Sequence, residues 1–237
     1  MAKSGAVFAA FVSAFATAQS TFTTIPMTVP WSISGDGTVV TGLRYLFPAT
    51  PSIRWTRESG AVTLPNLSIW VDSGARGLSD DGLVTVGHSL AEDGSIRAVF
   101  WIGDQGPYVV PLPPGSMSQI AIAERASSDG SKIFGTVEVS DCTPGSCRAW
   151  KWDATSGTQL IQPTETFRVV FVHKCDPLGR EIVVEGDACD GSTGIAALRS
   201  GVLDVETAAF AAFPVPAGFR VFVGRNASRD LSAVIGW

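Results

Sequence analysis

The sequence predicts an all-β fold built from repeats, and three observations support this prediction. Apolar residues make up 45% of the 237-residue chain and charged residues 16%, which is enough apolar material for a packed core. Gly (25) and Pro (14) are frequent, and the apolar set is rich in Val, Ile, Phe and Trp, a composition that favours short strands joined by tight turns. The same order of signals also recurs every 45 to 51 residues.

Each repeat begins with a Ser/Asp/Gly turn and a β-branched strand that ends in Gly. A second strand ends in Trp or another large apolar residue, and a Leu- or Val-rich strand, often followed by Pro, completes the unit. The turns are expected at 34–37, 79–82, 127–130 and 176–179, and the first strands at 38–42, 83–87, 131–135 and 181–186. The second strands are expected at 52–55, 97–101, 148–152 and 195–198, and the third at 62–65, 109–113, 159–163 and 202–205.

Two independent features of the repeat recur with the same spacing along the chain. The strand-ending glycines stand at 42, 87, 135 and 186, and the large apolar residues at 55, 101, 152 and 198. Repeats of about 40 to 50 residues with three or four strands each are typical of β-propeller blades. One small sheet cannot bury both of its faces alone, whereas sheets stacked radially bury them against their neighbours. The prediction is therefore a β-propeller.

The ends of the chain predict how the ring closes. A partial unit starts at Ser228, and residues 21–30 resemble the end of a repeat without its beginning. We expect 224–237 and 21–30 to share a blade, giving five blades of three to four strands, closed by N- and C-terminal strands. The single domain would cover 19–237, with whole repeats at about 31–76, 77–124, 125–171 and 172–223. A piece of a longer array is the alternative; a β-helix has shorter repeats.

Residues 1–18 are predicted to be a signal peptide. Lys3 precedes an apolar run over 6–16, and Ala16-Thr17-Ala18 supplies the small residues of a cleavage site. A buried N-terminal helix is the alternative.

Cleavage leaves 16 basic and 22 acidic side chains, a net charge of −6, and no basic run. Neither nucleic acid nor an anionic membrane surface is therefore an expected partner. No later segment is long and apolar enough to enter a membrane. We expect a secreted or periplasmic monomer whose partner is an extracellular small molecule, glycan or protein.

Export also favours disulfides among the four cysteines. Cys142 and Cys147 flank a turn sequence, and Cys175 and Cys189 bracket a β-rich stretch, so each pair would close a local loop. Three pairings are formally open, and these two are preferred. A metal site is the alternative, with the ligands His173, Cys175, Asp176 and Cys189.

The repeat resembles that of bacterial extracellular proteins of the HAF type, whose unit reads Ser-x-Asp-Gly-x-x-Val-x-Gly followed by His-Ala-Phe-x-Trp. Residues 34–42, 79–87 and 127–135 match the first block. Residues 97–101 and 148–152 match the second block with Arg in place of His. The resemblance covers nearly all of the mature chain and implies a secreted, propeller-like protein without a defined reaction.

The Ser-x-Asp-Gly turns offer a candidate metal site. If all turns lie on one rim of the channel, their carboxylates would form an oxygen-rich ring suited to Ca²⁺, and no other cofactor is expected. The alternative is that each Asp accepts hydrogen bonds within its own turn while Gly takes a positive φ. The candidate ligands are Asp36, Asp81, Asp129 and Asp230, with Asp176 as a further candidate.

A catalytic trio is the second candidate site. The segment 87–91 is similar to the nucleophile elbow of esterases, which would make Ser89 the nucleophile beside His88, with Asp81 as the third member. Against this, successive strand residues point to opposite faces, and Asp81 lies seven residues from His88, about 23 Å along a strand. The elbow also needs a strand-to-helix turn that an all-β chain does not offer.

The third candidate is a ligand-binding Trp70, expected to be exposed in a loop, whereas the repeat-locked tryptophans are expected to pack between blades. The leading functional prediction is a secreted binding propeller that recognises a ligand at the channel rim. The alternative is an extracellular hydrolase of an ester, lactone or glycoside. Since the turns and glycines recur in every unit, function is expected where the blades differ.

Overall fold

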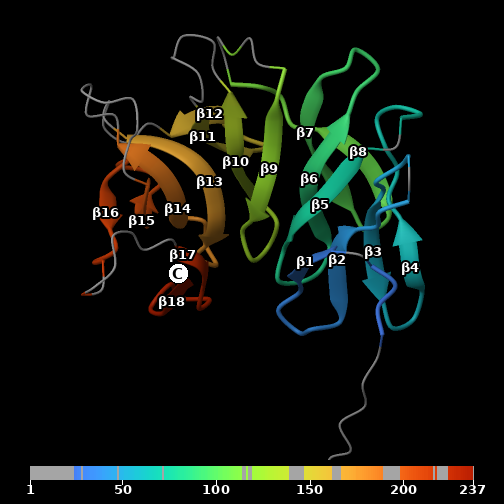
Figure 1. Ribbon diagram of the computed structural model, residues 1–237, viewed down its shortest axis with the longest axis horizontal. Helices are drawn as coiled ribbons and strands as arrows, with labels where there is room; N and C mark the ends of the chain where they lie inside the picture. Colours follow the sequence, from blue (N-terminus) through green and yellow to red (C-terminus); the bar gives the residue numbers. More distant parts are fainter. Residues whose placement is uncertain are drawn as a thin grey trace, which may run out of the picture.

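The computed structural model describes residues 24–27, 29–46, 48–70, 72–113, 116, 119–138, 147–161, 167–188, 198–215, 217 and 224–236. These residues form eighteen β-strands and no helix, which confirms the predicted all-β class (Figure 1). Within this part of the chain, no helix has the length and apolarity to cross a membrane.

The strands form four antiparallel sheets of four strands each, in which every strand pairs with the next along the chain. The first sheet contains β1 (Val29–Ile33), β2 (Val39–Leu43), β3 (Ser52–Thr56) and β4 (Gly60–Thr63). The second contains β5 (Ser73–Leu78), β6 (Val84–Leu90), β7 (Ile96–Ile102) and β8 (Gln105–Val109). The third contains β9 (Ala121–Ala126), β10 (Lys132–Glu138), β11 (Cys147–Asp153) and β12 (Gly157–Ile161). The fourth contains β13 (Phe167–Cys175), β14 (Glu181–Ala188), β15 (Leu198–Asp204) and β16 (Phe210–Ala212), and β17 (Gly224–Ala227) and β18 (Val234–Gly236) form a two-stranded sheet.

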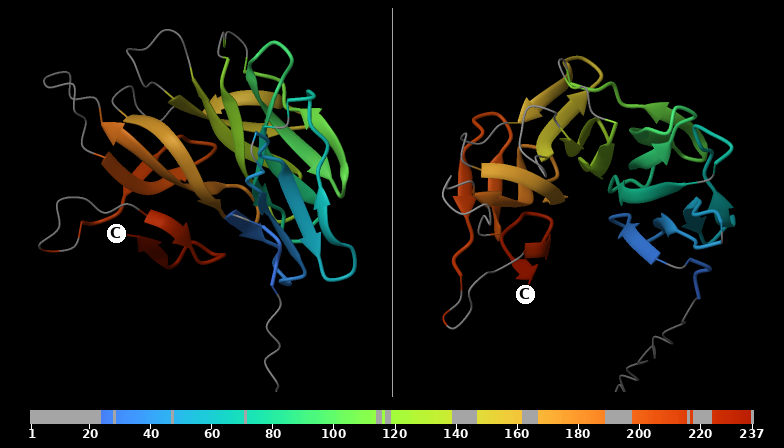
Figure 2. Two further views of the ribbon diagram at one scale, coloured as in Figure 1. Left: turned by 45° about the vertical axis from the view of Figure 1, so that its right-hand side comes forward. Right: turned by 45° about the horizontal axis from the view of Figure 1, so that its top comes forward.

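The sheets follow one another along an arc, with β1 and the β17–β18 pair at its two ends (Figure 2, right). The first strands of successive sheets, β1, β5, β9, β13 and β17, contact one another and line the inside of the arc. The Ser-x-Asp-Gly turns come directly after these inner strands, so each blade begins one strand earlier than the sequence repeat suggests. This is the arrangement of propeller blades around an axis.

The turns lie along one rim because backbone hydrogen bonds link them in series. Gly35 N donates to Asp80 O over 2.8 Å, Asp80 N to Ser128 O over 3.0 Å, and Ser128 N to Pro177 O over 2.9 Å. Arg229, in the β17–β18 turn, reaches the same rim, where its Nη2 lies 2.9 Å from Asp80 Oδ2. The last unit is thereby tied to the second blade.

Large side chains fill the interfaces between the blades, as predicted for the repeat tryptophans. Trp101 and Trp150 are fully buried, whereas Trp55 and Trp152 are partly exposed. Trp150 packs with Ile133 of its own blade and Val86 of the preceding one. Burial of this kind is the main force holding stacked blades together.

The predicted closure by a shared blade differs from the structure. Val29 and Pro30 pair with Leu43 and Gly42, so they belong to the innermost strand of the first blade and not to the end of another. Among the described residues, β17 pairs only with β18. The mismatch has one cause: the inner strand precedes its turn, so residues just before a turn start a blade.

The cysteine prediction also needs correction. Cys175 is a free, buried thiol whose Sγ donates to Ala126 O over 3.0 Å. In the β13–β14 hairpin it pairs with Ile182, whereas Ala188, next to Cys189, pairs with Phe167 at the other end. Six residues of strand, about 20 Å, separate Ile182 from Ala188, so the free Cys175 thiol lies at the opposite end of the hairpin from Ala188. Cys142 and Cys189, like the predicted signal peptide, lie outside the described residues, and the Cys142–Cys147 pairing stays a prediction.

Candidate binding site inside the arc

Every inner strand carries a β-bulge at the same place, three residues before the first residue of its turn. The extra residue of each bulge is skipped in the pairing with the second strand of the blade. A bulge turns a side chain away from the regular alternation of its strand and is common beside functional sites. The skipped residues are Trp31, Arg76, Glu124, His173 and Arg225.

The repeat glycines are explained by these bulges. A Cβ built on Gly42, Gly87 or Gly135 would overlap a backbone carbonyl oxygen of the inner strand beside the bulge. Only glycine lets the two strands approach this closely. In the fourth blade Val184 stands at this register, and β13 has a second irregularity at Val170. Gly186, the marker expected from the sequence repeat, pairs with Val169 instead.

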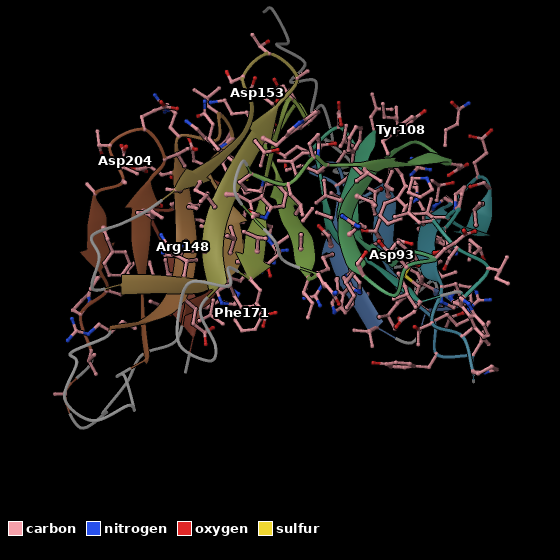
Figure 3. All side chains as sticks on the ribbon, turned by 90° about the horizontal axis from the view of Figure 1, so that it is seen from above. Asp93, Tyr108, Arg148, Asp153, Phe171 and Asp204 are labelled. Carbon is pink, nitrogen blue, oxygen red and sulfur yellow. The ribbon has the colours of Figure 1, made fainter. Side chains whose placement is uncertain are left out.

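The four bulge side chains that the structure describes line one cavity of about 290 Å³, here called the bulge cavity. Its lining residues are Trp31, Arg76, Glu124, Arg125, Phe171, Val172 and His173. A second cavity of about 230 Å³ shares Trp31, Arg125 and His173 and extends to the rim at Asp80, Ser128 and Arg229. Phe171 is 38% exposed and lies on the side of the blades opposite Asp153 and Tyr108 (Figure 3).

Arg76 is held in the bulge cavity by two neighbours. Its guanidinium carbon lies 5.1 Å from the centre of the Trp31 ring, a cation–π contact, and its Nε donates to Nδ1 of His88 over 3.3 Å. Burial, and then the Arg76 charge, lower the pKa of His88 to about 4, so His88 is neutral and accepts this bond near pH 7. Gly74 leaves room for both rings, because a Cβ there would overlap Trp31 and His88.

Glu124 and Arg125 are neighbours on β9 with different surroundings. The Glu124 carboxylate is buried and accepts a hydrogen bond from Val172 N. Burial raises the pKa of Glu124 to about 7, despite the opposing effects of that bond and of Arg125 and Arg76. Arg125 donates to the carbonyl oxygens of His173, Arg76 and Glu124. It therefore ties three inner strands together through backbone groups.

His173 contributes the imidazole of the bulge cavity. Its Nε2 lies 2.8 Å from Oε2 of Glu185, which comes from the neighbouring strand β14, and both side chains are buried. Its ring centre is 6.0 Å from that of Phe171. A carboxylate on one ring nitrogen fixes the orientation of an imidazole, so His173 is a positioned group in the cavity wall.

The turn aspartates do not form the predicted calcium ring. Asp36 accepts from Ser34 Oγ at 2.7 Å and from Thr38 N at 3.0 Å, and the other three make the same two bonds in their own turns. These bonds lower the pKa of Asp36 and of Asp230 to about 2. Asp176 replaces the turn serine, not its aspartate, since its Oδ1 accepts from Glu181 N as Ser34 Oγ accepts from Val39 N.

No group of three or more potential metal ligands occurs among the described residues. Of the alternative metal site, Cys175 bonds a carbonyl, and burial raises the pKa of its thiol to about 12. His173 faces Glu185, and Asp176 is engaged by its turn. Cys189 lies outside the described part of the chain. His173, Cys175 and Asp176 therefore each bond a different partner, although they are close in sequence.

Chelation tests this interpretation of the turns. Because each carboxylate accepts hydrogen bonds from donors of its own turn, EDTA is expected to leave the melting temperature unchanged within about 1 °C, since removing a ligand shifts stability only where the folded state bound it. The measurement compares melting in EDTA and in millimolar CaCl₂. A melting temperature that rises with calcium would contradict it.

The predicted catalytic trio is not assembled either. Ser89 is fully buried and its Oγ accepts from Leu67 N over 3.1 Å, while His88 faces Arg76. Asp81 is exposed in the turn, where it bonds Ser79 Oγ and Leu83 N. Alternation along β6 separates the first two side chains, and strand length separates the third. Trp70 is 68% exposed, as predicted, and ligand binding by it stays a prediction.

Sequence reasoning missed the bulge residues, although a signal was present. Positions 31, 76, 124 and 173 keep a constant spacing of three residues before the turns at 34, 79, 127 and 176. This repeat position differs chemically from blade to blade, since it holds Trp, Arg, Glu and His in turn. Charged residues in buried strands are uncommon and are a recognised sign of function.

Comparison with known proteins agrees with the fold. No family model and no curated protein matches the chain. Among solved structures, TolB from Acinetobacter baumannii is similar over 79% of this chain and 43% of its own, with 14% identity and a TM-score of 0.52. The Cps50 (Swd1) β-propeller domain from Myceliophteria thermophila is similar over 92% and 64%, with 9% identity and a TM-score of 0.52. The chain spans less than two thirds of either structure, and at this identity the likeness shows the β-propeller fold alone.

Proposed function

We propose that this chain is an exported binding propeller whose ligand occupies the bulge cavity. The observation that carries the proposal is the common register of four bulges whose side chains meet in one cavity. A purely structural device would repeat one residue type in each blade, as the Ser-x-Asp-Gly turn does. The bulge position instead presents an aromatic ring, a guanidinium, a carboxyl group and an imidazole, which suits recognition of one particular ligand.

Export is part of the proposal and rests on the sequence. The predicted signal peptide at 1–18 and the resemblance to HAF-type extracellular repeat proteins support a secreted or periplasmic location. The partner class stays as predicted: an extracellular small molecule, glycan or protein.

A ligand screen with two tryptophan variants tests the proposed site. A panel of glycans, peptides and small metabolites would be screened by thermal shift, and hits measured by calorimetry. Trp31→Ala is expected to weaken binding at least about tenfold, because truncating a central aromatic typically costs 2 kcal/mol or more. Trp70→Ala, at the rival loop site, is the control and should leave the affinity unchanged. The opposite outcome would move the site to Trp70.

One observation supports the hydrolase alternative with a different residue set. Glu124 is a buried carboxyl group in a cavity, and its pKa of about 7 suits a general acid at neutral pH. If the chain hydrolyses glycosides or esters, Glu124→Gln should abolish turnover of chromogenic substrates while Asp81→Asn leaves it intact. No turnover on a broad set, together with Trp31-dependent binding, would leave binding as the function.

A further inference from the structure

At a pH below the pKa of Glu124, the bulge cavity carries positive charge that its own carboxyl groups do not fully offset. Two guanidinium groups, Arg76 and Arg125, line it, and Arg125 makes its hydrogen bonds to neutral carbonyl oxygens. Glu124 resists ionisation because it is buried, and Glu185 is already paired with His173. Charges held away from water are costly without a partner, so the cavity favours an anion.

Arg76 is the group prepared to bind that anion. Its Nε is fixed by His88 and its face by Trp31, whereas Nη1 and Nη2 have no hydrogen-bond or ion-pair partner in the part of the chain that the structure describes. Two terminal nitrogens on a fixed planar group match the two oxygens of a carboxylate. Because the side chain is already oriented, less conformational entropy is lost on binding.

We infer that the bulge cavity binds a small organic carboxylate, whose two oxygens pair with Nη1 and Nη2 of Arg76 and whose apolar body lies against Trp31 and Phe171. The inference rests on the proposed function and names its ligand class. The cavity volume of about 290 Å³ is just below the usual range of small-molecule pockets, roughly 300 to 1,000 Å³, and so suits a small ligand. With a single unpaired guanidinium, the site suits one carboxylate better than a polyanion.

Glu124 gives the binding a predictable pH dependence. The charged groups that face it are Arg125 on β9, Arg76 from β5, and Glu185 from β14 beside His173 of β13, and Val172 N donates to it. Below its pKa of about 7, Glu124 is neutral and the cavity attracts a carboxylate; above it, the ionised group repels one. Affinity is therefore expected to fall as the pH rises from 6 to 8.5.

Calorimetry with three matched probes, benzoate, benzamide and benzylammonium, tests the inference on the full chain at pH 6. Benzoate should bind at least about tenfold more tightly than the other two, because only it forms a charge-assisted bidentate pair. Arg76→Gln should lower benzoate affinity at least about tenfold. Arg97→Gln, which removes a partly exposed arginine paired with Asp93, is the control. Should Arg76→Gln fail to fold, Arg76→Lys, which keeps the charge and loses the fork, should bind benzoate more weakly than the wild type.

Glu124→Gln adds a second readout. The readout is the ratio of benzoate affinity at pH 6 to that at pH 8.5, which is expected to be about tenfold in the wild type and close to one in the variant, because glutamine does not ionise. Preference for benzylammonium, or equal benzoate affinity in wild type and Arg76→Gln, would overturn the carboxylate inference. If panel ligands bind in a Trp31-dependent way and benzoate does not, the inference fails while the proposed function stands; if nothing binds through Trp31, both fail.

Discussion

Replacing Gly87 by alanine is expected to destabilise the protein by about 3 kcal/mol, which lowers the melting temperature by about 6 to 12 °C. The added Cβ would lie 1.8 Å from the Gly74 carbonyl oxygen, and that oxygen belongs to backbone fixed by the sheet. Relief would require β5 to move away from β6 at the Arg76 bulge. Thermal melting and urea unfolding, followed by tryptophan fluorescence, measure the effect.

Gly94→Ala in the same blade is the matched control. Nothing lies within 4 Å of a Cβ at Gly94, and its φ of +80° limits the cost to that of the left-handed region, about 1 kcal/mol. If Gly87→Ala cost no more than Gly94→Ala, the inner strand would be free to shift, and the bulge would not be the reason for the repeat glycine.

The glycines and turns also explain how far the sequence predicts the fold. A turn of the Ser-x-Asp-Gly type is a local structure, since Asp36 bonds residues within two positions of itself. Its conformation and its repetition can therefore be predicted from four residues of sequence. Gly42, Gly87 and Gly135 recur at one register because a Cβ at any of them would overlap a backbone carbonyl oxygen of the inner strand. Together they predict a blade period and hence a propeller.

The candidate site is harder to predict from the sequence because its side chains come from different blades and meet only in the folded protein. Glu124 contacts Val172 N, 48 residues away, and the meaning of each bulge residue depends on strands from other blades. The fourth unit shows the limit of alignment: Asp176 looks like a turn aspartate, yet it makes the bond of the turn serine. Cys175 and Cys189 similarly appear to close a loop, whereas hairpin register places Cys175 opposite Ile182.

Replacing Glu124 by glutamine is expected to stabilise the protein at alkaline pH, which is the opposite of what loss of a buried ion pair would do. The pKa of Glu124 is raised from 4.5 to about 7 by burial, so the folded state holds a proton that the unfolded state releases. This contribution to stability is fully present below pH 4.5 and is lost as the pH rises to about 7. A shift of this size corresponds to roughly 3 kcal/mol above pH 7.

Urea unfolding at pH 4.5 and pH 8 distinguishes the two cases. Glutamine has the size of glutamate and keeps an oxygen for Val172 N, so Glu124→Gln should match the wild type at pH 4.5 and exceed it at pH 8. Glu181→Gln, on the exposed side of β14, is the control for the loss of a negative charge and should change neither value by more than about 0.5 kcal/mol. A variant less stable than the wild type at pH 8 would mean that Arg76 and Arg125 hold Glu124 ionised. The cavity would then contain a compensated ion cluster and lose its preference for an anionic ligand, so this stability measurement bears directly on what the propeller binds.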